Sequence, residues 1–112
     1  MISQDVIIPV DGSNMPAYFA RPQEGSGPHP AVIVLHEVFG FTPETKRVTE
    51  LLASIGYVGL AINYFHRSSP QMAQPYTEEG VKAAFEIAKT VTAQSVNADV
   101  RAAIGWLNSQ PF

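Results

Sequence analysis

The fold of this chain is decided by the stretch AVIVLHEVFG, residues 31–40. Its first five residues are apolar without a break, and the segment between Pro30 and Gly40 is too short for a regular helix. A continuous apolar run of this length is typical of a strand covered on both faces, as in a parallel sheet flanked by helices. We therefore expect a buried strand over residues 31–35, followed by a loop.

A helix and a second buried strand should follow this loop. Thr42 can cap the helix, Pro43 suits its first position, and Gly56 is a natural stop. Between them, four apolar residues recur at helical spacing and predict the buried stripe: Val48, Leu51, Leu52 and Ile55. Residues 57–62 form the next apolar run. A strand, a helix and a strand in this order predict a right-handed crossover and a parallel pair.

The flanking segments complete the predicted architecture. Residues 6–10 and 15–20 are apolar and are separated by turn-forming residues 11–14, which indicates a hairpin. One further helix should begin at Thr77 and another should cover residues 95–109, with residues 90–92 leaving open whether the two are separate or one kinked helix. Each helix has an apolar stripe: Val81, Ala84, Phe85 and Ala88 in the first, and Val100, Ala103, Ile104 and Leu107 in the second. The aromatic residues Tyr57, Phe41 and Trp106 are also expected in the core. The fold class is therefore α/β, with an antiparallel hairpin followed by parallel strands and flanking helices.

Composition excludes several classes of function. Apolar residues make up 46% and charged residues 15% of the 112, which is typical of a folded globular chain. Ten acidic and seven basic residues without a basic run argue against a nucleic-acid partner. No apolar run is long enough to span a membrane and no signal peptide is visible, so a cytoplasmic location is expected. The sequence lacks cysteine, metal-ligand spacing and a glycine-rich phosphate loop, so we expect no metal and no cofactor.

The loops after the two apolar strands should lie together, because ligands of open α/β sheets bind at the carboxyl ends of parallel strands. Glu37 is an acid at the end of an apolar strand, which favours a role in handling protons; pairing with an arginine or a helix cap is the alternative. Arg67 could bind a substrate carboxylate or simply be exposed. His36 and Tyr64 could line the pocket or only support it.

These features in this order resemble the dienelactone hydrolase family of the α/β-hydrolases. The resemblance is carried by the Glu-Val-Phe-Gly loop, by residues 54–57 before the second strand, by the aromatic segment 63–67 and by residues 99–111. It implies that residues 1–112 are the N-terminal part of a single domain. It also implies a carboxylic-ester or lactone hydrolase that needs no cofactor.

The resemblance assigns roles to particular residues. Glu37 would tune the nucleophile, the backbone N–H of Val38 would be one oxyanion donor, and four residues would contact the substrate: His36, Phe39, Tyr64 and Arg67. The nucleophile of the family is a Cys or Ser in a Gly-x-Cys/Ser-x-Gly elbow further along the chain. No such motif occurs in this sequence, so we expect residues 1–112 alone to be inactive.

A catalytically inactive binding or interaction module is the alternative. Without the strand that would carry the nucleophile, residues 31–35 should lie at the edge of the sheet. An exposed apolar edge strand is a site for pairing with another chain. We therefore expect self-pairing, or pairing with a missing C-terminal half.

Overall fold

The computed structural model describes residues 1–23, 27–68 and 74–111. In these ranges it contains four strands and three helices: β1 (Ile2–Val10), β2 (Ser13–Arg21), β3 (Ala31–Leu35), α1 (Pro43–Ser54), β4 (Val58–Ile62), α2 (Glu78–Ala88) and α3 (Ala93–Asn108). The strands form one sheet in the order β1-β2-β4-β3. β1 pairs with β2 and β2 with β4 in antiparallel orientation, whereas β3 and β4 are parallel. The predicted α/β class, with its hairpin and parallel pair, is confirmed.

The hairpin turns more tightly than the sequence predicted. Asp11 and Gly12 have φ angles of 50° and 78°, the two positive values that a two-residue type I′ turn requires. Val10 and Ser13 are therefore directly paired, and β2 begins at Ser13 instead of after residue 14. This register places the Ser13 side chain at the tip of the hairpin.

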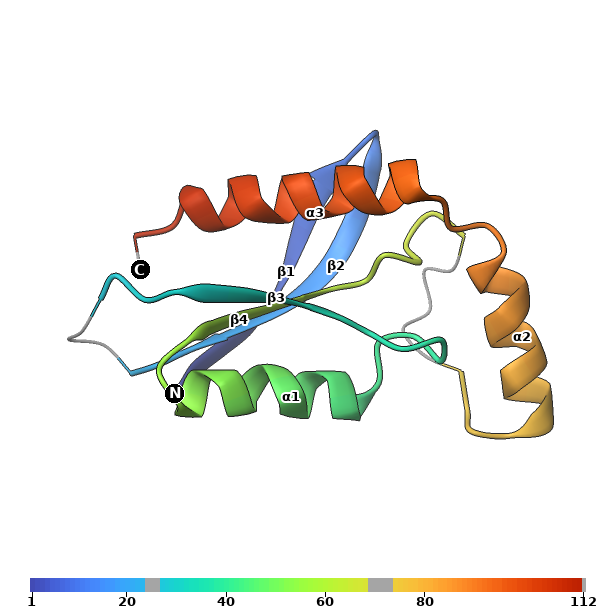
Figure 1. The fold of residues 1–112 in the computed structure, drawn as a ribbon, viewed down its shortest axis with the longest axis horizontal. Helices are drawn as coiled ribbons and strands as arrows, with labels where there is room; N and C mark the ends of the chain where they lie inside the picture. Colours follow the sequence, from blue (N-terminus) through green and yellow to red (C-terminus); the bar gives the residue numbers. More distant parts are fainter. Residues whose placement is uncertain (24–26, 69–73, 112) are drawn as a thin grey trace.

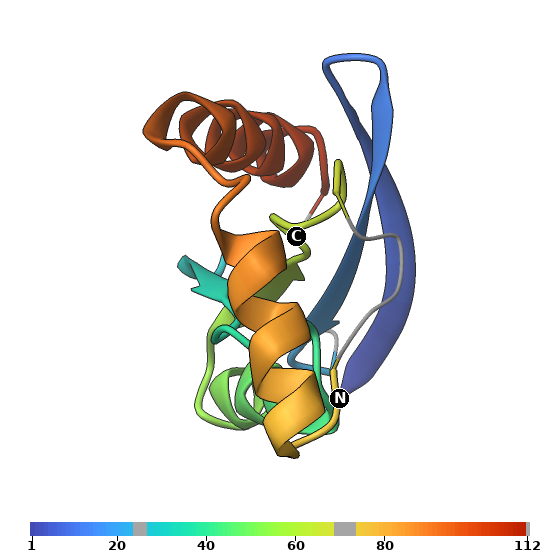
Figure 2. The same cartoon turned by 90° about the vertical axis from the view of Figure 1, so that its right-hand side faces the viewer.

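The sheet lies between α3 on one face and α1 on the other (Figure 1). Alternate residues of β2 divide between the two sides: Met15, Ala17 and Phe19 join the core beneath α3, and Tyr18 joins the smaller cluster with Phe41. β4 is buried at all five positions because it has a strand on each side and a helix over each face. α2 lies beyond the carboxyl ends of β3 and β4 (Figures 1 and 2).

The ends of α1 follow the sequence, but its buried face does not. The hydroxyl of Thr42 accepts from the N–H of Thr45, and Gly56 has a φ of 101° just past the end, as predicted. The predicted stripe is wrong, because Leu51 and Ile55 are 53% and 63% exposed. The buried residues are small: Thr45, Thr49 and Ala53. The helix lies so close to β4 that a Cβ added at Gly59 would be 2.8 Å from the carbonyl oxygen of Thr49.

Exposure corrects three other predictions. Phe85, Ile104 and Tyr57 were expected in the core but are exposed. β3 has β4 as its one neighbour among the described strands, so Val32 and Leu35 are exposed and the strand is an edge. The prediction that both faces of this strand are covered is therefore wrong, and the prediction that residues 31–35 lie at the edge of the sheet is confirmed.

The two last helices are separate. Thr92 and Ser95 form a reciprocal capping box at the start of α3, which resolves the question left open at residues 90–92. No helix in the described ranges is both long and apolar enough to cross a bilayer.

Candidate active site

Two loops meet at the carboxyl ends of the parallel strands. Residues 36–41 follow β3 and residues 63–67 follow β4, so both leave the same edge of the sheet. The Tyr64 hydroxyl donates to the backbone carbonyl of His36 over 2.7 Å. The rings of these two residues are stacked, with centroids 4.0 Å apart and planes 8° apart. The structure thus brings together two predicted site residues that are 28 positions apart in sequence.

His36 packs between the two loops. Its ring is buried and lies edge-on to Phe65, with centroids 4.6 Å apart. Its Nδ1 is 2.7 Å from the carbonyl oxygen of Glu37, and because a carbonyl can only accept, Nδ1 carries the proton. Burial lowers the pKa of His36, against the opposing effects of the Glu37 carbonyl and the Asn63 side chain. Burial therefore favours the neutral ring, and the contact of His36 with a substrate stays a prediction.

Glu37, Val38 and Phe39 lie in a tight turn. The Gly40 N–H donates to the carbonyl of Glu37 over 3.0 Å, and Gly40 itself has a φ of 95°. Within residues 1–23, 27–68 and 74–111, the backbone N–H of Val38 has no hydrogen-bond acceptor. This N–H is therefore available at the position where the resemblance places an oxyanion donor.

The Glu37 carboxylate is exposed beside this turn. The Tyr76 hydroxyl donates to its Oε1 over 3.2 Å, and the Tyr76 ring meets Phe39 edge-on with centroids 4.4 Å apart. A cavity of about 200 Å³ adjoins Glu37 and is lined also by Leu35 and Glu44. Sequence reasoning missed Tyr76, since it lies 39 residues from Glu37 and belongs to no motif.

Arg67 is engaged with carboxylates of its own chain. Its guanidinium is 2.9 Å from Asp99, which is fully buried, and 3.1 Å from the exposed Asp11. The hydrogen bond to Asp99 raises the pKa of Arg67, so the guanidinium stays charged. The contact between Arg67 and a substrate carboxylate stays a prediction, and the carboxylates that Arg67 binds in the structure are those of Asp11 and Asp99.

A second buried histidine completes this polar cluster. His66 Nε2 is 2.9 Å from Asp99, and its Nδ1 is 2.7 Å from the hydroxyl of Ser13. No sequence motif indicates this cluster, because Ser13 and Asp99 lie 53 and 33 residues from His66. In the described parts of the chain, no three His, Cys, Asp or Glu residues are arranged to hold a metal ion.

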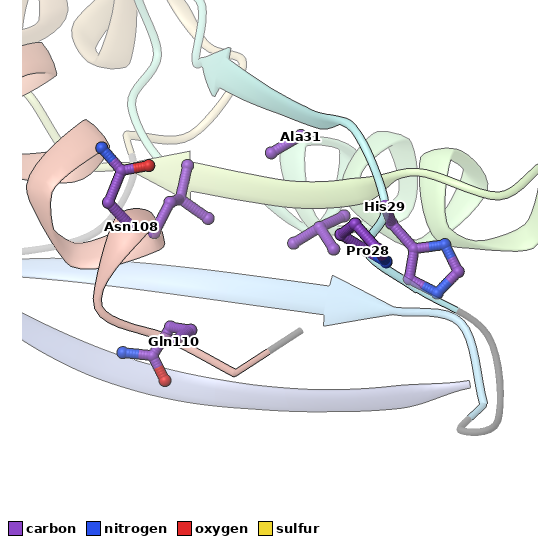
Figure 3. Close-up of a pocket in the computed structure, with 7 residues that line it drawn as sticks. Pro28, His29, Ala31, Asn108 and Gln110 are labelled. Atoms are coloured by element: carbon purple, nitrogen blue, oxygen red, sulfur yellow. The ribbon is translucent and has the colours of Figure 1, made fainter.

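A cavity of about 340 Å³ opens at the other end of the sheet (Figure 3). It lies at the first residues of β3 and β4, and His29, Asn108 and Gln110 line it from two sides. Because ligands of open α/β sheets bind at the carboxyl ends, and His29 is the one titratable group among the described residues that line this cavity, we assign the site to the loops after β3 and β4.

The chain thus has a mixed α/β sheet with a helix on each face and an acid on the loop after a parallel strand. The sequence pattern of the family described as "Dienelactone hydrolase family" matches residues 15–112. The chain belongs to this family.

Individual relatives agree with this assignment. The chain is 31% identical to a Synechocystis protein named "Putative carboxymethylenebutenolidase" over 95% of its own length and 43% of that protein. It is 32% identical to the carboxymethylenebutenolidase of a Pseudomonas species, over 90% of the chain and 42% of the relative. A Klebsiella pneumoniae crystal structure described as a "Putative Dienelactone Hydrolase" superposes with a TM-score of 0.78 at 32% identity, over 94% of this chain and 42% of that one. The chain thus spans less than half of the relatives that it matches.

Proposed function

We propose that this chain supplies the supporting half of an ester or lactone hydrolase site, and that the nucleophile is a Cys or Ser from a segment outside residues 1–112. The observation that carries the proposal is the turn after β3. It combines an exposed carboxylate at Glu37 with an unpaired N–H at Val38, beside a cavity along the open edge of the sheet. A neighbouring strand at this edge would bring its own loop to the same place.

Each of these groups has a defined task in acyl transfer. Glu37 accepts the proton of the nucleophile, or holds the nucleophile by a hydrogen bond, before the substrate arrives. The nucleophile then attacks the carbonyl carbon, and the developing oxyanion takes one hydrogen bond from Val38 and a second from the residue after the nucleophile. The ester or lactone C–O bond breaks, and water later releases the acid.

The substrate-binding assignments follow from the same loops. Phe39 and Tyr64 lie on the loops after β3 and β4, where their rings would contact the substrate, and His36 stacks on Tyr64 and lines the cavity beside Glu37. Arg67 can receive a substrate carboxylate by exchanging Asp11, because an exposed ion pair contributes little and is readily replaced. The substrate is a small ester or lactone. A cytoplasmic location, inferred from composition, stays a prediction.

The test uses the backbone of Val38. In the full-length protein, which on this proposal also carries the nucleophile and the Asp and His of the family's triad, Val38→Pro removes the N–H, and Val38→Ala is the matched control that keeps it. We expect Val38→Pro to lower kcat for p-nitrophenyl acetate by about 100-fold and Val38→Ala to change it little. Equal loss in both variants would contradict the oxyanion role.

Residues 1–112 alone provide a second check. We expect no turnover of p-nitrophenyl acetate by this chain that depends on Glu37. Measurable turnover that Glu37→Gln abolishes would overturn the view that the nucleophile lies elsewhere.

An inactive binding module is the second candidate, and the exposed β3 edge favours it. Val32 and Leu35 leave apolar surface at a strand with one side unpaired among the described strands. Such an edge would pair with a second copy or with the C-terminal half. A reading frame that stops after Phe112 would support this candidate, and one that continues into the nucleophile motif would exclude it.

Sedimentation tests the pairing itself. We expect the purified chain to associate as its concentration rises, and Val32→Lys to shift it toward the monomer. Ile7→Lys is the matched control, because Ile7 is also exposed and apolar but lies on β1 at the opposite edge. A monomer at every concentration would rule out pairing through β3.

A further inference from the structure

Three segments that are distant in sequence meet at the tip of the hairpin. Ser13 begins β2, His66 follows β4, and Asp99 lies in α3. Figure 2 shows the segment after β4 lying between α3 and the hairpin. The Ser13 hydroxyl is 2.7 Å from His66 Nδ1, and His66 Nε2 is 2.9 Å from Asp99.

The partners of Asp99 indicate where one proton of the His66 ring lies. Asp99 is held by Arg67 through both carboxylate oxygens, so it acts as an acceptor. His66 Nε2 therefore donates to Asp99. In the neutral ring this leaves Nδ1 with a lone pair, which accepts from the Ser13 hydroxyl.

The hydroxyl of Ser13 is the most accessible group of the three, and His66 and Asp99 are buried behind it. His66 and Asp99 have 1% and 0% of their side-chain surface exposed, whereas Ser13 is only partly buried at the hairpin tip. A hydroxyl next to a shielded base, which is itself oriented by a third group, is the arrangement of an activated nucleophile. Arg67 adds rigidity, because its planar guanidinium fixes the carboxylate.

We propose that Ser13 is a nucleophile activated by His66 and Asp99, and that it takes an acyl or phosphoryl group from activated esters. With diisopropyl fluorophosphate, the Ser13 oxygen attacks phosphorus and the P–F bond breaks. The hydroxyl proton passes to His66 Nδ1, and fluoride leaves with its electron pair. Ser13 then carries the phosphoryl group as a stable adduct, and the proton is lost to solvent.

The test is the rate of labelling of residues 1–112 by diisopropyl fluorophosphate, with the adducts located by peptide mass mapping. Ser3 is the internal reference, because it is exposed on β1 and has no histidine partner among the described residues. General-base assistance contributes about 100-fold or more, so Ser13 should be labelled about 100-fold faster than Ser3. Equal rates at the two serines in the folded wild-type chain would overturn the proposal without any variant.

Variants separate the base from the surrounding fold. His66→Gln and Asp99→Asn should each slow labelling of Ser13 by at least about tenfold. Asp11→Asn is the matched control, because it removes the charge that pairs with Arg67 but tolerates the positive φ of the turn and leaves the three residues in place. Unchanged labelling in a folded His66→Gln variant would refute the role of His66. Glu37→Gln should not change the labelling rate of Ser13, so the labelling test is independent of the hydrolase proposal.

Discussion

Replacing Asp99 by alanine removes the one buried carboxylate that joins α3 to the loop after β4. The side chain is fully buried and holds His66 and Arg67, each over 2.9 Å. In Asp99→Ala, the N–H of His66 would be left buried without an acceptor, and Arg67 would lose its inner partner. This residue therefore tests whether the polar cluster stabilises the fold.

The expected loss can be estimated from burial. Removing one partner of a buried pair destabilises a protein by about 3–5 kcal/mol. Arg67 is 29% exposed in its side chain and can be partly rehydrated, so the low end, about 3 kcal/mol, applies. For a urea dependence of about 2 kcal/mol per molar, the unfolding midpoint should fall by about 1.5 M.

Urea unfolding followed by circular dichroism and by the fluorescence of Trp106 measures this loss. Trp106 reports on the same helix, since it lies on α3 and packs against Phe19 with ring centroids 5.4 Å apart. Asp11→Asn is the control, because it removes an exposed negative charge from the same arginine, tolerates the positive φ of the turn and should lose at most about 1 kcal/mol.

The comparison between the two aspartates decides the outcome. A loss in Asp99→Ala no greater than in Asp11→Asn would refute the estimate. If Asp99→Ala does not fold, Asp99→Asn gives a lower bound on the loss, because its amide oxygen can still accept from His66 while the charge that pairs with Arg67 is removed.

Three further predictions concern packing, titration and capping. Gly59→Ala should destabilise the chain by about 1–3 kcal/mol, because the new Cβ would clash with the carbonyl of Thr49. Gly105→Ala on α3 has open space around the new Cβ and should stabilise the chain by about 1 kcal/mol. Thermal unfolding of the two variants measures this difference. The pKa of His36 is lowered in the fold, so the unfolded chain binds more protons, and the free energy of unfolding should fall as the pH drops below about 6.5. In urea unfolding at several pH values, His36→Phe should weaken this pH dependence of stability. Thr92→Ala removes the cap of α3 and should lose about 1 kcal/mol, measured by chemical unfolding; no change would show that the capping box does not stabilise the helix.

Much of the candidate site could be predicted because it lies in one short segment. The strand, the acid at Glu37 and the turn that ends at Gly40 are consecutive, so their relative positions depend on local geometry. Tyr64 was also named from sequence, because it follows the parallel neighbour of β3. The hydrogen bond between Tyr64 and His36 could not be predicted, since it depends on the register of the two strands.

The sequence by itself determined the order of the elements and where most of them end. Thr42, Gly56 and the Asp-Gly turn act through hydrogen bonds and backbone angles of their immediate neighbours, which do not depend on the rest of the fold. Apolar runs likewise identified β3 and β4. For β4 the reason is that a strand buried by its neighbours needs apolar residues throughout.

Only the tertiary structure decided which faces meet. α1 turns its small residues to the sheet, since the absence of a side chain at Gly59 allows the backbones to approach, and hydrophobic periodicity contains no information about that distance. The contacts of Ser13, His66 and Asp99 were invisible for a related reason. They join residues 33 to 53 positions apart, and such contacts follow from the sheet order and from the packing of α3 instead of from any local pattern.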